Sequence, residues 1–133
     1  MTTPEGATKS QVKSLLKEFG LVSAAEAAKA AGKVTASGWY YMPVSNGMGV
    51  SGIPDFVGHF HGRFFAIETK APGKKPTALQ QFQLDALSTT GAARFVVSGQ
   101  EGVWELGAWL FEHKACQECG SYYNTTELWE RST

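Results

Sequence analysis

Two short apolar runs joined by His61-Gly62 constrain the fold of this chain more than any other segment. The runs cover residues 55–60 and 63–70, and the His-Gly pair between them is typical of a tight hairpin turn. Within the second run, Phe64 to Ile67 is apolar at every position, which indicates a strand covered on both faces. We therefore expect an antiparallel hairpin whose second strand lies inside a sheet.

A helix and another strand are expected after the hairpin. Thr77 is a typical N-cap for a helix that runs to about Thr90, and Gly91 ends it. The apolar run 94–98 then predicts a strand, and the order strand, helix, strand implies a right-handed crossover between parallel strands. The sequence thus predicts an α/β fold with a small mixed central sheet flanked by helices.

Segments on either side of this unit predict further elements. These are a helix from Thr3-Pro4 to about Gly20, an Ala-rich helix over 23–31, a strand over 39–44 and a short helix over 105–111. The pattern fades from about Cys116 onward. We therefore expect one domain over 1–115, with an Ala-rich insertion at about 23–36, and a loosely ordered tail over 116–133.

Composition favours a folded, cytoplasmic protein. The chain has 133 residues, of which 43% are hydrophobic, enough for one domain with its own core. No apolar run approaches the roughly 20 residues that span a bilayer, so no membrane association is expected. The first residues are polar and lack the pattern of a secretion signal, which makes the cytoplasm the expected compartment.

The net charge of zero hides an uneven distribution. Residues 1–100 hold ten Lys and Arg against six Asp and Glu, whereas residues 101–133 hold two against six. Arg63, Lys74 and Lys75 accompany the hairpin, and we expect them to contact phosphates. The row formed by Lys9, Lys13 and Lys17 is expected to be a solvated helix face.

The hairpin carries the residues of a metal-dependent phosphodiester hydrolase. Side chains alternate along a strand, so Glu68 and Lys70 share one face while Thr69 takes the other. If the strands pair, Asp55 and Glu68 converge on one Mg²⁺ or Mn²⁺ ion, with the Thr69 backbone carbonyl as a third ligand. Lys70 would orient the attacking water or offset developing charge, and Gln80 on the next helix would bond the same water or a phosphate oxygen.

Each of these motifs also has a structural interpretation. Glu68 and Lys70 would pair with each other if the hairpin lay at the surface, although charges that follow a buried strand are typical of α/β active sites. Trp39, Tyr40 and Tyr41 are residue types that stack on unpaired bases, yet aromatic clusters in a strand are more often core.

Taken together, the motifs resemble the VRR-NUC family of the PD-(D/E)XK nuclease superfamily, which has small stand-alone members in bacteriophages. The resemblance covers about residues 39–98 and rests on four segments: Gly52-Ile53-Pro54-Asp55, then residues 63–73 with Ile67-Glu68-Thr69-Lys70, then Pro76 to Gln80, then Gly91-Ala92. It implies a restriction-endonuclease-like core and divalent-metal catalysis on branched or structured DNA, such as flaps or Holliday junctions. For a phage protein the compartment would be the host cytoplasm.

The resemblance also assigns roles to individual residues. It makes Asp55 and Glu68 metal ligands, Lys70 the catalytic lysine and Gln80 the glutamine of the family's helix. A further acidic ligand is expected on the first helix, where Glu5 fits better than Glu18. Two symmetric cuts in a four-way junction would require two active sites and hence a homodimer.

Two alternatives remain open from the sequence. One is a non-catalytic nucleic-acid-binding module that keeps the nuclease fold. The other concerns His113, Cys116 and Cys119, whose spacing can present three ligands to Zn²⁺, although a closed site needs a fourth. Two reduced cytosolic thiols near a chain end are the expected state of these cysteines.

Overall fold

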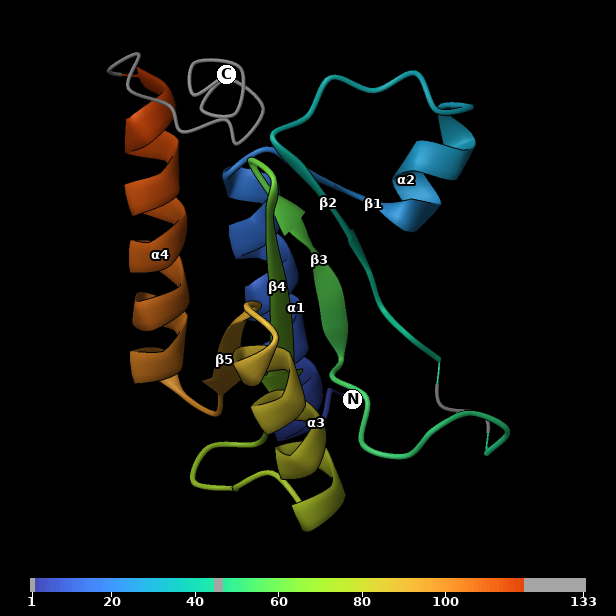
Figure 1. The fold of residues 1–133 in the computed structure, drawn as a ribbon, viewed down its shortest axis with the longest axis vertical. Helices are drawn as coiled ribbons and strands as arrows, with labels where there is room; N and C mark the ends of the chain where they lie inside the picture. Colours follow the sequence, from blue (N-terminus) through green and yellow to red (C-terminus); the bar gives the residue numbers. More distant parts are fainter. Residues whose placement is uncertain (1, 45–46, 119–133) are drawn as a thin grey trace.

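Five strands form one mixed sheet in the order β1-β2-β3-β4-β5 (Figure 1). The computed structural model describes residues 2–44 and 47–118, with side chains up to residue 114. The strands are β1 (Leu21–Ser23), β2 (Gly38–Tyr41), β3 (Phe56–Phe60), β4 (Arg63–Thr69) and β5 (Ala93–Val97). The predicted α/β class with a small mixed sheet is therefore confirmed.

The strand pairing follows the predicted order. β3 and β4 pair antiparallel, and both His61 and Gly62 in the turn between them have positive φ, as a two-residue hairpin turn requires. β4 and β5 pair parallel through the crossover that contains α3 (Ala78–Thr89). β2 adds antiparallel to β3, and β1 adds parallel to β2.

Among the described residues, α1, α2 and α3 begin directly after a residue whose side chain caps the helix. Thr3 caps α1 (Pro4–Glu18), and Ser23 caps α2 (Ala24–Lys29) through a capping box with Glu26. Thr77 caps α3 in the same way with Gln80. No residue of α2 is buried, as expected for a short Ala-rich helix.

The two faces of the sheet are covered differently. One face carries the main core, in which Phe56, Phe60 and Phe65 pack against buried residues of α1 and of α4 (Gln100–Glu118). α3 lies over the opposite face at its β5 side, and its buried Leu84 is not part of that core cluster (Figure 1). Among the residues that the structure describes, the β2 and β3 part of the second face carries exposed side chains, including Trp39, Tyr41 and His59, and we call it the open face.

The structure differs from the sequence-based expectations in three places. The helix predicted over 105–111 is longer and extends from Gln100 to Glu118. Its length was not predicted because the exposed Trp104 and Phe111 obscure the helical spacing of the buried Leu106 and Leu110. Strand β1 was not expected, since three residues are too few to show alternation. Phe64 is 46% exposed, so within the run Phe64 to Ile67, predicted to be covered on both faces, only Phe65 to Ile67 is buried.

No helix in the described part of the chain is both long enough and apolar enough to cross a membrane.

Candidate metal centre

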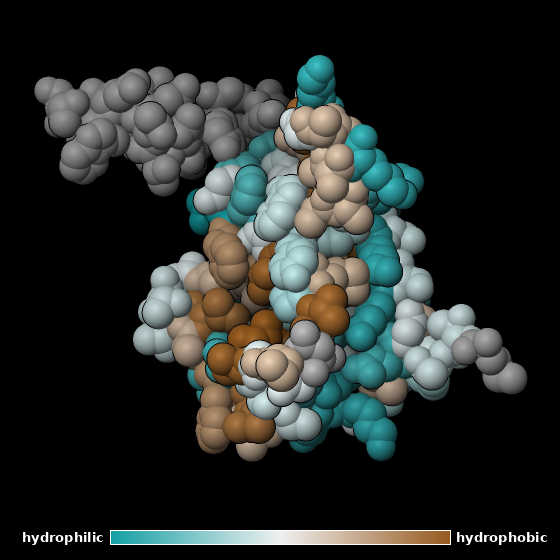
Figure 2. All heavy atoms as spheres, turned by 90° about the vertical axis from the view of Figure 1, so that its right-hand side faces the viewer, coloured by the Kyte–Doolittle hydropathy of each residue, from teal (hydrophilic) through white to brown (hydrophobic). Residues whose placement is uncertain are grey.

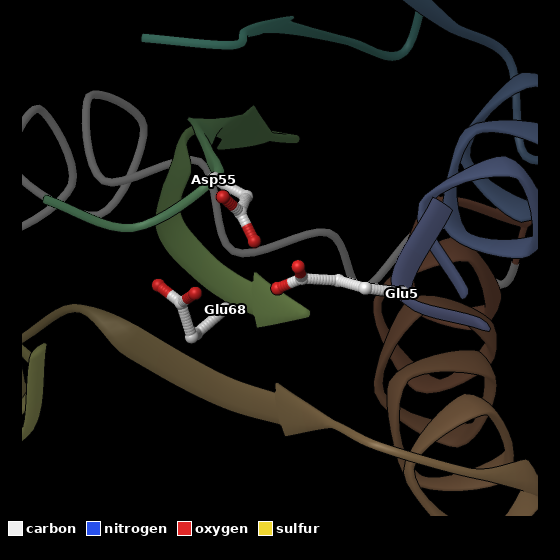
Figure 3. Close-up of side chains that lie close together, drawn as sticks. All are labelled: Glu5, Asp55 and Glu68. Atoms are coloured by element: carbon white, nitrogen blue, oxygen red, sulfur yellow. The ribbon is translucent and has the colours of Figure 1, made fainter. Parts of the chain in front are cut away.

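Three carboxylates from separate elements meet at one end of the sheet (Figure 3). Glu5 comes from the first turn of α1, Asp55 lies directly before β3, and Glu68 is the penultimate residue of β4. One oxygen atom from each lies within 4.8 Å of the other two. The hairpin register brings Asp55 and Glu68 together, because their neighbours Phe56 and Ile67 are paired in the β3–β4 ladder.

Glu68 is the most strongly perturbed member of this acidic cluster. Its side chain is 1% exposed, and its Oε2 atom has no hydrogen-bond partner among the residues that the structure describes. Burial, and then the negative charge of Asp55, raise the pKa of Glu68 from 4.5 to about 8, although the Lys70 ammonium opposes this rise. A buried carboxylate oxygen without a partner is costly, and a cation would compensate it.

Asp55 is held in place by Thr69. The Thr69 amide and hydroxyl both donate to Asp55 Oδ2, at 2.9 and 2.6 Å. Lys9 Nζ lies 3.7 Å from the other oxygen, Oδ1. Strand alternation predicted that Thr69 faces away from the site, but at the end of the strand its hydroxyl reaches the aspartate. The two donors fix the orientation of the Asp55 carboxylate, which lies beside Glu68.

Lys70 follows β4 directly and is fixed through its backbone. Its N–H donates to the Val97 carbonyl at 2.9 Å, and its carbonyl accepts from the Thr8 hydroxyl at 3.1 Å. Thr8 is a buried residue of α1. The same contact therefore ties the helix that carries Glu5 to the strand that carries Glu68.

Gln80 contacts the cluster from α3. Its Nε2 atom donates to Glu68 Oε1 at 3.2 Å, while its Oε1 atom accepts from the Thr77 backbone N–H at 2.9 Å. Because the capping box fixes the amide oxygen, the amide nitrogen faces the carboxylate. Gln80 thus lies at the acidic cluster with Glu68 as its partner, and its contact with a water molecule or phosphate oxygen remains a prediction.

A pocket of about 360 Å³ opens beside the cluster. Asp55 and Gln80 line it together with the Gly-rich segment that precedes β3. Gly52 has φ +86°, and a Cβ atom there would lie 2.4 Å from the Leu79 carbonyl oxygen. Only glycine lets this segment pack against the start of α3, so the pocket depends on that residue.

Other predicted residues lie further from the cluster. Glu18 lies at the far end of α1, about 20 Å along the helix from Glu5, so Glu5 is the acidic residue that α1 brings to the site. Arg63 begins β4, about 17 Å along the strand from Glu68, so it does not lie beside the acidic cluster. Lys74 and Lys75 are exposed in the segment between β4 and α3.

The surface pairing of Glu68 with Lys70 is excluded by the burial of Glu68, and no ion pair joins the two side chains among the described residues. The Thr69 backbone carbonyl remains a predicted ligand.

Sequence reasoning missed three residues that shape the site. Lys9 was assigned to a solvated row, but it lies 3.7 Å from Asp55. Its position four residues after Glu5 places both on one helix face, and this spacing could have identified it. The hydroxyls of Thr8 and Thr69 gave no comparable signal, because their partners are distant in sequence or lie across the sheet end.

The predicted zinc ligands fall mostly outside the described residues. The Cys116 side chain and the whole of Cys119 lie there, so the structure does not test that prediction. His113 is described, and its Nδ1 atom lies 2.6 Å from the Trp109 carbonyl oxygen.

The acidic cluster has the donor set of a divalent cation site. Carboxylate oxygens are the ligands that Mg²⁺ and Mn²⁺ prefer, and Glu68 Oε2 is buried without a hydrogen-bond donor among the described residues. A search for relatives gives no further guide, since no protein-family model, curated protein or solved structure matches this chain.

Replacing Thr69 by valine should weaken divalent-cation binding by about tenfold or more, because removal of a group that orients a ligand typically costs that much affinity. Valine keeps the volume and the backbone donor but loses the 2.6 Å bond to Asp55. Calorimetric titration with Mn²⁺ measures the effect. Thr35→Val, at an exposed position outside the site, is the matched control, and equal affinities for the two variants would contradict the assignment.

Proposed function

We propose that the protein is a divalent-metal-dependent endonuclease that hydrolyses phosphodiester bonds in DNA. The observation that carries the proposal is Glu68, a buried carboxylate with a partnerless oxygen, beside two further carboxylates and Lys70. A glutamate side chain is rarely buried in this way without a partner, and a strongly raised pKa is typical of functional sites. Phosphodiester hydrolysis is the reaction for which carboxylates and a lysine at one strand end are suited.

Each side chain has a distinct role in this proposal. Glu5, Asp55 and Glu68 would hold a Mg²⁺ or Mn²⁺ ion, with the Thr69 carbonyl as a further ligand. When bound, the ion neutralises the phosphate, lowers the pKa of a water molecule and stabilises the leaving oxygen. The Lys70 ammonium orients the attacking water or offsets the charge that develops on the phosphate. Gln80 positions Glu68, and Thr69 positions Asp55.

The substrate class rests on the resemblance of the motifs to the VRR-NUC nucleases. The order of elements, with Asp55 before one strand, Glu68 and Lys70 at the end of the next, and Gln80 on the following helix, supports a restriction-endonuclease-like core. Branched or structured DNA, such as flaps or four-way junctions, is therefore the proposed substrate. Cleavage of a four-way junction at two symmetric positions would need a homodimer.

Cleavage of labelled linear duplex, single strand, flap, splayed arm and four-way junction, with Mg²⁺ or Mn²⁺, tests the function. The expected result is metal-dependent cutting of a branched substrate that disappears with EDTA and in Asp55→Asn. Lys17→Ala, at the far end of α1, is the matched control for folding and purity. Binding without any cleavage by the wild-type protein would reject the enzyme in favour of a non-catalytic nucleic-acid-binding module.

A further inference from the structure

The open face of the sheet carries aromatic side chains in register with the acidic cluster. Trp39, His59 and Phe64 pair directly across β2, β3 and β4, and form one row of outward-pointing residues. Tyr41, Val57 and Ala66 form the next row. Glu68 follows on β4 at the same alternation, and Asp55 lies beside it at the end of the sheet, directly before β3. The aromatic rows therefore lead toward the proposed catalytic site.

These aromatic side chains are exposed, whereas their strand neighbours are core residues. Trp39, Tyr41 and Phe64 are 37, 44 and 46% exposed, while Tyr40 between the first two is 6% exposed. The Trp39 and Tyr41 rings are stacked, with centroids 6.4 Å apart and planes inclined by 13°. In Figure 2, hydrophobic residues (brown) gather in the lower left part of the view, whereas hydrophilic residues (teal) lie along its right-hand edge. The interpretation of this aromatic cluster as core is therefore correct for Tyr40 and wrong for Trp39 and Tyr41.

The electrostatics of this surface favour a polyanion. From residue 38 to residue 67 the sequence contains a single carboxylate, Asp55, which belongs to the acidic cluster. The exposed His59 lies between Trp39 and Phe64, whereas Arg63, next to Phe64 in the sequence, pairs with the core residue Phe60 and takes the other face by alternation. A protein–protein contact would not need a surface so free of acidic groups, whereas a phosphate backbone would be repelled by them.

The path from the aromatic rows to the cluster is continuous. Pro43 and Val44, just beyond the end of β2, line the pocket that Asp55 and Gln80 also line. Side chains two residues apart on a strand are about 7 Å apart, so the Tyr41 row is about 7 Å from the acidic pair and the Trp39 row about 13 Å. A chain bound along the face would enter the site from one direction.

We propose that the open face binds unpaired nucleotides, whose bases stack on Trp39 and Tyr41 while the backbone runs toward the acidic cluster. Flat exposed aromatic residues on a sheet are a recurrent platform for single strands, and base stacking does not depend on sequence. The proposal rests on the proposed nuclease function and specifies its substrate: DNA with a single-stranded segment beside the scissile bond. A fully paired duplex offers no free base faces to these rings.

Binding without cleavage tests this proposal separately from catalysis. The probes are a fluorescein-labelled 15-nucleotide oligo-dT and a blunt duplex, and their anisotropy is measured in EDTA. Trp39→Ala should weaken oligo-dT binding about tenfold or more and leave duplex binding unchanged. Trp39→Phe, which keeps a ring, should restore most of the affinity. Trp104→Ala removes an exposed tryptophan from α4 on the other side of the sheet and should have no effect.

Three outcomes would overturn the platform. Unchanged oligo-dT affinity in Trp39→Ala is the first, and equal losses for single strand and duplex are the second. The third is a change from dimer to monomer in analytical ultracentrifugation with DNA affinity retained, which would make the face a contact between two copies. Ring-dependent single-strand binding by a protein that cleaves no substrate would support the platform and reject only the nuclease.

Discussion

Glu68→Gln is expected to lower cleavage by about 10³-fold and at the same time to stabilise the metal-free protein at pH 8. Glutamine fits the site because its amide oxygen can still accept from Gln80, as Glu68 Oε1 does at 3.2 Å. What it lacks is the negative charge that a divalent cation needs. The same charge is unfavourable when no cation is bound, since Glu68 is buried beside Asp55.

The sign of the pH dependence follows from the pKa of Glu68. Folding raises this pKa from 4.5 to about 8, so the folded protein keeps a proton that the unfolded chain has already lost. The contribution of Glu68 to the free energy of unfolding is therefore greatest below about pH 4.5 and falls as the pH rises toward 8. As the pH rises from 5 to 8, the free energy of unfolding of the wild-type protein should fall by roughly 3 kcal/mol more than that of Glu68→Gln.

Urea unfolding of both proteins in EDTA at pH 5 and pH 8 measures this difference. Glu105→Gln, at an exposed position on α4, is the control for loss of one carboxylate. Parallel pH profiles for wild type and Glu68→Gln would contradict the raised pKa. A divalent cation must displace the proton of Glu68, so Mn²⁺ affinity should rise as the pH increases toward about 8, and the variant should show no such rise.

Lys70→Ala is expected to reduce cleavage by about 10²–10³-fold while leaving the acidic cluster assembled. The backbone of residue 70 makes its contacts to Val97 and Thr8 whichever side chain it carries, so the end of β4 should stay in place. The Lys70 ammonium lowers the pKa of Glu68, and its loss should raise that pKa further. The pH profile of Mn²⁺ binding should then shift upward.

Single-turnover cleavage and calorimetric Mn²⁺ titration on the same samples separate the two effects. Lys17→Ala removes a lysine from the far end of α1 and should match wild type in both measurements. If Lys70→Ala lost metal binding as completely as Glu68→Gln, Lys70 would serve the assembly of the site and not the reaction. Unchanged cleavage would remove the proposed catalytic role.

Much of the site could be predicted because its central residues are close in sequence. Asp55 and Glu68 flank one hairpin, and the apolar pattern with the two-residue turn determines the register that places them opposite each other. Gln80 follows through a capping box whose signature, Thr77 with Gln80, is readable in the chain. Local rules of turns, caps and alternation therefore sufficed for these residues.

The approach of α1 depended on packing. Val12 and Leu16 bury one side of this helix in the core, and that orientation brings Glu5 and Lys9 to Asp55 from about 50 residues away in the sequence. The motifs indicated that Glu5 was a candidate, but no local pattern could distinguish a ligand near a chain end from a solvated glutamate. Helix position is determined by the apolar residues it buries, and those contacts are not visible in a motif.

The hairpin, the crossover, the helix caps and the pairing of Asp55 with Glu68 could be predicted from local patterns, because each depends on residues within one or two turns or strands. The burial of Glu68 and the exposure of Trp39 and Tyr41 depend instead on how the helices pack against the sheet. Alternation separates the two faces of a strand but does not say which face a helix covers. Here α1 and α4 cover one face and α3 covers only part of the other, so the aromatic rows remain open beside the acidic cluster.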